Sequence, residues 1–138
     1  MIGIIVATHA AMAQGLIDAA EMILGPLPQV AALHVGRQDG PDEIRQRFLK
    51  TFDALDATEA GVLILSDMFG GTPANIGLSF MERTRLEVLT GVNLPMLLKA
   101  CNARANLPLE VLALEVKEYA MNGILLVSQL MKDSHDRR

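Results

Sequence analysis

Residues 66–75 read Ser-Asp-Met-Phe-Gly-Gly-Thr-Pro-Ala-Asn and join two different sequence patterns. Before them, residues 61–65 (Gly-Val-Leu-Ile-Leu) form a short apolar run that is typical of a buried strand. After the two glycines, Pro73 suits the first turn of a helix, because its φ is already helical and it has no N–H to leave unpaired. Thr72 then falls at the N-cap. The stretch therefore predicts a strand that passes through a Gly-Gly turn into a helix.

The same turn predicts a site for an anion. Glycines allow a positive φ and let a ligand approach the backbone, and the free N–H groups at a helix start attract negative charge. We expect phosphate oxygens to be held by the backbone amides of Met68, Phe69, Gly70, Gly71 and Thr72. The Thr72 hydroxyl can bind phosphate or serve only as a helix cap, and the sequence leaves both roles open.

Asp67 indicates a function beyond simple phosphate binding, because a carboxylate repels phosphate and would weaken a site that only binds it. His9 follows a second buried-strand pattern at residues 2–8, so both side chains lie at the carboxyl ends of apolar strands. If Asp67 accepts the proton of one imidazole nitrogen, the other nitrogen is free to attack a phosphoryl group. The alternative is that Asp67 only bonds its own turn backbone.

Strand and helix patterns alternate along the chain, which predicts an α/β fold with a mainly parallel sheet. Strands are expected at residues 2–8, 30–35, 61–65 and 86–89, and helices at about 11–24, from 41 onward, and at 73–81, 94–103 and 108–121. We expect a three-layer α/β/α sandwich with strand order 2-1-3-4, which sets the strands that precede His9 and Asp67 side by side at the topological switch point. In the first helix the expected apolar stripe is Met12, Leu16, Ala19, Ala20 and Ile23.

Residues 124–130 (Ile-Leu-Leu-Val-Ser-Gln-Leu) follow the Asn-Gly pair that ends the last expected helix. We interpret them as a fifth, antiparallel edge strand, with a helical continuation as the alternative. One domain is expected over residues 1–131, followed by a charged, flexible tail at 132–138.

Composition narrows the function classes. The formal net charge is −4 and there is no basic cluster, which argues against nucleic-acid binding. The single cysteine, Cys101, cannot form an internal disulfide and fits a reducing compartment. The apolar run at the N-terminus is too short for a signal peptide or a membrane span. We expect a cytoplasmic protein with no cofactor, no metal and no direct membrane insertion.

Three collinear motifs are similar to those of one family: Thr8-His9, the run from Asp67 to Asn75, and Leu89-Thr90-Gly91-Val92-Asn93-Leu94-Pro95-Met96. Together they resemble the mannose-class IIA proteins of the bacterial phosphoenolpyruvate-dependent phosphotransferase system. The resemblance implies that His9 accepts phosphate from the carrier protein HPr and passes it to a IIB component on a separate chain. It also implies that Asp67 orients His9 and that the Gly70-Gly71-Thr72 turn binds the phosphoryl group.

The resemblance further implies a homodimer in which an antiparallel carboxy-terminal strand is exchanged between subunits. We also expect supporting roles at the site for Thr8, Asn75, Gly91 and Asn93. From the residues alone, Gly91 is expected to turn the chain and Asn93 to cap the following helix. Two rival functions remain open: a phosphoryl-donor subunit for a dihydroxyacetone kinase, and a regulatory module that acts through its phosphorylation state without sugar transport. A phosphatase acting through a phosphohistidine is a weaker reading, because no second acid or base is evident.

Overall fold

The computed structural model describes residues 1–55, 59–68, 75 and 85–136. The elements in chain order are β1 (Gly3–His9), α1 (Met12–Leu24), β2 (Val30–Val35), α2 (Pro41–Leu55), β3 (Val62–Ser66), β4 (Leu86–Leu89), α4 (Leu94–Ala103), α5 (Leu109–Asn122) and α6 (Val127–Asp136). The helix expected at residues 73–81 lies outside the described residues, apart from Asn75. The other expected strands and helices up to residue 122 are confirmed to within one or two residues at each end.

The sheet has four parallel strands in the order β2-β1-β3-β4, as the sequence predicts. Ile5 in β1 pairs with Ala31 in β2 and with Ile64 in β3. Because β1 and β3 are neighbours while their connections leave toward opposite sides, the carboxyl ends of these two strands form the switch point.

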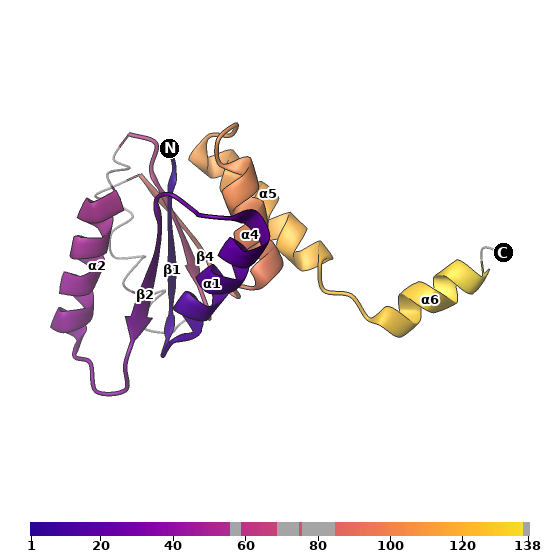
Figure 1. The fold of residues 1–138 in the computed structure, drawn as a ribbon, viewed down its shortest axis with the longest axis horizontal. Helices are drawn as coiled ribbons and strands as arrows, with labels where there is room; N and C mark the ends of the chain where they lie inside the picture. The colour runs from indigo at the N-terminus through magenta and orange to yellow at the C-terminus, as the bar shows by residue number, and fades with distance from the viewer. Residues whose placement is uncertain (56–58, 69–74, 76–84, 137–138) are drawn as a thin grey trace.

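Helices cover both faces of the sheet (Figure 1), with α2 on one side and α1, α4 and α5 on the other. Alternate residues of β1 serve the two cores. Ile4 and Val6 pack toward α1, α4 and α5, whereas Ile5 belongs to the smaller core under α2 with the fully buried Phe48. Because both faces of β1 are buried, its side chains must be apolar on both faces, which explains the continuous apolar run of this strand.

Helix α1 is rotated relative to the expected stripe. Ala20 is buried and Leu16 packs against the core, as expected, but Met12 and Ile23 are 47% and 58% exposed. Ala13 and Ile17, which were not in the expected stripe, are buried in their place. Two apolar stripes overlap on this helix, and the hydrophobic pattern alone does not decide which of them faces the sheet.

The predicted fifth strand is wrong for this structure. Residues 124–126 have no regular structure, and residues 127–136 form α6, which extends away from the body of the protein (Figure 1). A strand needs a neighbouring strand for its hydrogen bonds, whereas a helix pairs its backbone groups within the segment. The large apolar side chains from Ile124 to Leu130 are between 48% and 77% exposed. The expected boundary between residues 131 and 132 falls within α6.

Gly61 immediately precedes β3 and has a positive φ of 92°. Its carbonyl accepts a hydrogen bond from the backbone N–H of Gly3, at 3.1 Å. A Cβ added at this position would lie 2.8 Å from the carbonyl oxygen of Arg85 and 2.8 Å from a methyl carbon of Leu109. Glycine is therefore required where β1, β3 and the start of α5 meet.

We predict that Gly61→Ala lowers the free energy of unfolding by about 2–4 kcal/mol, because it combines a left-handed backbone with a steric clash. Gly15→Ala is the matched control: Gly15 lies within α1, has no atom within 4 Å of its added Cβ, and should gain about 0.5–1 kcal/mol. Urea unfolding of both variants measures the difference. Equal stabilities for the two variants would contradict this account of Gly61.

Candidate functional site

The site forms where β1 and β3 end. Ala7 pairs with Ser66 in the parallel register, so the residues that follow this pair, Thr8-His9 and Asp67-Met68, leave the sheet at the same edge. His9 is the last residue of β1, and Asp67 is the first residue after β3. The expected proximity of the two side chains is confirmed.

Asp67 and His9 are joined by two hydrogen bonds. The backbone N–H of His9 donates to Oδ2 of Asp67 at 3.0 Å, and ring atom Nδ1 of His9 lies 2.7 Å from the same oxygen. The other carboxylate oxygen, Oδ1, accepts from the backbone N–H of Met68 at 3.0 Å. With Nδ1 as the donor, the lone pair of the neutral imidazole is on Nε2. The His9 side chain is 47% exposed and that of Asp67 only 15% exposed.

The surroundings of Asp67 favour its charged form. Partial burial acts to raise the pKa of the carboxyl, but the hydrogen bonds from the backbone and ring of His9, the charge of His9 and the Met68 amide together hold the pKa below its ordinary value of 3.8. Asp67 is therefore an ionised acceptor at neutral pH.

The turn between β1 and α1 has two features that hold His9 in place. Thr8 is fully buried, and its hydroxyl oxygen accepts a hydrogen bond from the backbone N–H of Ala13 at 2.8 Å. Ala10 has a positive φ of 51°, and its N–H donates to the carbonyl of Val35 at 2.9 Å. The strained backbone at Ala10 was not foreseen, because neither glycine nor asparagine marks the position.

Two of the expected supporting residues have the structural roles that the sequence predicts. Gly91 turns the chain with a φ of 76°, and Asn93 caps α4, its side-chain oxygen accepting from the N–H of Met96 at 2.8 Å. The neighbouring Val92 N–H donates to the carbonyl of Ser66 at 2.9 Å. This loop therefore fixes the end of β3, one residue before Asp67.

The expected phosphate loop is described only in part. Met68 is 55% exposed beside Asp67, and Asn75 is exposed. The Met68 N–H, which was expected to bind phosphate, donates to Oδ1 of Asp67 instead. Phe69, Gly70, Gly71 and Thr72 lie outside the described residues, so their phosphate contacts stay a prediction. Within residues 1–55, 59–68, 75 and 85–136, no three side chains of the His, Cys, Asp and Glu types gather as a metal site would require.

His34 does not belong to the site. It pairs in register with Thr8, but it lies on β2, the other neighbour of β1, and is exposed. Its carbonyl accepts from the guanidinium of Arg47, which also binds Asp39. The topology therefore brings His9 to Asp67 and keeps His34 apart from that carboxylate.

A doubly wound α/β fold with an oriented imidazole at its switch point defines a protein suited to nucleophilic chemistry at a histidine. Residues 3–117 match the family model described as "PTS system fructose IIA component". The chain belongs to this family, as a mannose-class EIIA component of the phosphotransferase system.

Relatives in several bacteria share the family. The fructose-specific EIIA component of Bacillus subtilis is 29% identical over 130 residues, which cover 94% of this chain and 88% of that protein. The mannose-specific EIIAB component of Escherichia coli K12 is 33% identical over 119 residues, which cover 84% of this chain and 36% of the longer protein. The crystal structure of an EIIA component from Streptococcus agalactiae superposes with a TM-score of 0.85 at 28% identity, covering 94% of this chain and 99% of that one.

Family membership assigns the chain to phosphoryl transfer in sugar uptake. Among the helices that the structure describes, none has the length and apolar character needed to cross a bilayer.

We predict that Asp67 stabilises the fold in a pH-dependent way. Because the pKa of the folded-state carboxyl lies below 3.8, its contribution is present above that value and is lost as the pH falls through the lower, folded-state pKa. Asp67→Asn should therefore unfold at lower urea concentration than the wild type at pH 7, because asparagine has a single acceptor oxygen and either His9 or Met68 then faces an NH₂ group that cannot accept. The difference should shrink between about pH 5 and pH 2. A stability difference between Asp67→Asn and the wild type that does not change with pH would contradict the assignment of Asp67 as an ionised hydrogen-bond acceptor.

Proposed function

We propose that this protein is a histidine phosphocarrier. His9 accepts a phosphoryl group from the phosphohistidine of HPr and passes it to a IIB component during sugar uptake. The observation that carries the proposal is the 2.7 Å contact between Nδ1 of His9 and Oδ2 of Asp67, which leaves Nε2 as the nucleophile. Because both proposed partners work in the cytoplasm, the protein is proposed to act there.

In the accepting step, the Nε2 lone pair of His9 attacks phosphorus and forms a new N–P bond. The N–P bond to the imidazole of HPr breaks, and its electron pair stays on that imidazole. Positive charge develops on the His9 ring as the new bond forms, and the ionised Asp67 stabilises this charge through the Nδ1 proton. The transfer to IIB reverses these roles, with His9 as the leaving group.

The phosphoryl group must lie close to the carboxylate of Asp67, so the repulsion between these two negative groups has to be offset. Both oxygens of Asp67 already accept N–H groups, Oδ2 from His9 and Oδ1 from Met68, which draws its charge away from an incoming anion. Because the Met68 N–H is already bound to Asp67, we assign the phosphoryl oxygens to the backbone amides from Phe69 to Thr72, on the basis of the Gly-Gly-Thr-Pro sequence at the expected helix start. Transfer then depends mainly on positioning and on the local field.

His9→Ala should take up no acid-labile phosphate when it is incubated with phosphoenolpyruvate, enzyme I and HPr, because the nucleophile is absent. His34→Ala is the matched control, since it removes an exposed imidazole that lies away from Asp67, and it should be labelled as the wild type is. The radiolabel transferred from phosphoenolpyruvate measures the phosphate uptake of both variants. Undiminished label on His9→Ala would end the phosphocarrier proposal.

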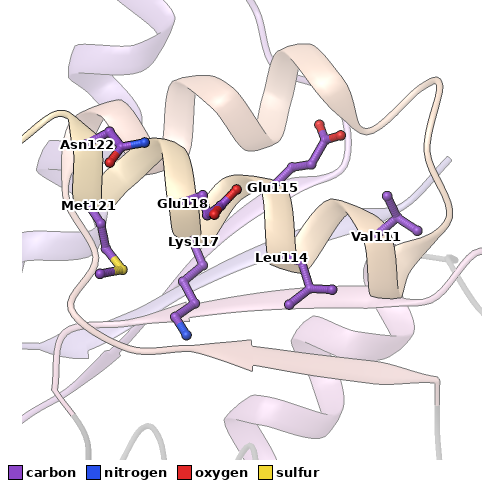
Figure 2. A pocket seen from close by; sticks show the side chains of 7 residues that line it. All are labelled: Val111, Leu114, Glu115, Lys117, Glu118, Met121 and Asn122. Carbon is purple, nitrogen blue, oxygen red and sulfur yellow. The ribbon is translucent and has the colours of Figure 1, made fainter.

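We also propose that the protein is a homodimer formed through its carboxy-terminal segment. Val111, Leu114 and Met121 line a hollow of about 530 Å³ on the outward face of α5 (Figure 2), and they are 41%, 68% and 61% exposed. Apolar side chains of residues 124–131 are also exposed, and β4 is an edge strand of the sheet. In a dimer each carboxy-terminal segment, with its helix α6, can cover α5 and the β4 edge of the other subunit.

Truncation after Gly123 should convert the dimer to a monomer, because it removes the apolar segment that reaches the other subunit. Truncation after Met131 is the control: it removes the polar and charged residues 132–138, keeps the apolar ones, and should leave the dimer intact. Sedimentation equilibrium measures the mass of each. A dimer that persists without residues 124–138 would refute the role of this segment.

A further inference from the structure

Helix α1 begins without a cap from its own N-cap residue. Ala11 occupies that position and has no side-chain oxygen. The buried N–H of Ala13, in the first turn, instead donates to the hydroxyl of Thr8 at 2.8 Å. Thr8 lies inside β1, so this strand supplies the cap for the helix that follows it.

The hydrogen bond between Thr8 and Ala13 closes a loop that contains His9. Four residues separate the two partners, and Ala10 among them has a positive φ of 51°. Alanine avoids this conformation, so the turn relaxes unless it is held at both ends. One end is held by the Ala10 N–H, which donates to Val35 on β2, and the other end is held by the Thr8 hydroxyl.

Both contacts of His9 with Asp67 depend on this turn. The backbone N–H and the ring Nδ1 of His9 must reach the same carboxylate oxygen, at 3.0 and 2.7 Å. A small rotation of the backbone at His9 separates these two groups from Oδ2 together. The neutral ring is then free to carry its proton on Nε2, which removes the nucleophilic lone pair from that atom.

We propose that Thr8 is a positioning residue for His9: its hydroxyl fixes the start of α1 and thereby keeps the His9 ring in the tautomer that is protonated on Nδ1. The proposal rests on the phosphocarrier function. The Thr8 hydroxyl bonds the backbone of Ala13, whereas the Asp67 carboxylate bonds His9 directly, so Thr8 acts through the backbone of the turn.

The test compares Thr8→Val, which keeps the shape of the side chain but loses the acceptor, with Thr8→Ser, which keeps the acceptor. Thr51→Val is the control, because the Thr51 hydroxyl also bonds a backbone group, the carbonyl of Arg47 on α2, away from the site. The ¹⁵N chemical shifts of the His9 ring report the tautomer in each folded variant. The rate of phosphate uptake from HPr is measured in parallel.

Thr8→Val should lose the preference for the Nδ1-protonated tautomer and accept phosphate about tenfold to a hundredfold more slowly. Thr8→Ser should retain the tautomer and most of the rate, and Thr51→Val should match the wild type. If Thr8→Val does not fold, Thr8→Cys takes its place as a small side chain with a poor acceptor, and the same loss is expected.

Wild-type ring shifts and a wild-type rate in folded Thr8→Val, or in Thr8→Cys where that variant replaces it, would overturn the proposal. So would an equal loss in Thr8→Ser, since packing rather than the hydroxyl would then hold the turn. The ¹⁵N chemical shifts of the His9 ring can be measured without any partner protein. If wild-type protein takes no phosphate from HPr, the phosphocarrier function fails, while the shifts still decide whether Thr8 sets the tautomer.

Discussion

One carboxylate oxygen, Oδ2 of Asp67, binds the backbone N–H and the ring of the same residue, His9. This double contact fixes both where the imidazole stands and which of its nitrogens carries the proton. It exists because β1 and β3 are adjacent and parallel, so that their last residues reach the same edge of the sheet. A different strand order would leave the two residues apart, whatever their chemistry.

The two ends of the sheet serve different purposes. At the carboxyl end, the strained Ala10 follows His9 and the exposed Met68 follows Asp67. At the amino end, the buried guanidinium of Arg104 donates to the carbonyls of Ile2, Pro28 and Gln29 and ties the starts of β1 and β2 to the end of α4. Burial lowers the pKa of Arg104, and these carbonyls replace the water that the cation has lost. The Arg104 hydrogen bonds therefore join three elements of the fold at the end of the sheet away from His9 and Asp67.

The apolar runs and the turn residues were sufficient to predict the strand order and the meeting of His9 with Asp67, because parallel strands of this length have few possible arrangements. The capping role of Asn93 followed from its position before a helix that opens with a proline. The rotation of α1 did not follow, since Met12 and Ala13 begin two overlapping stripes of similar apolarity. The strain at Ala10 depends on the bond from its N–H to Val35, which is distant in sequence, and on the bond between Thr8 and Ala13 that closes the turn. The state of residues 124–130 was not predictable locally, because a strand there depends on a partner edge that the chain itself does not place beside it.

The most direct test of the central claim is the position of the phosphate on the His9 ring. The His9–Asp67 geometry assigns the proton to Nδ1 and the attack to Nε2. After phosphorylation by HPr, ¹⁵N and ³¹P spectra of the labelled protein should show coupling between phosphorus and Nε2 of His9. Phosphate on Nδ1 would contradict the role of Asp67, and phosphate on any other residue would contradict the site itself.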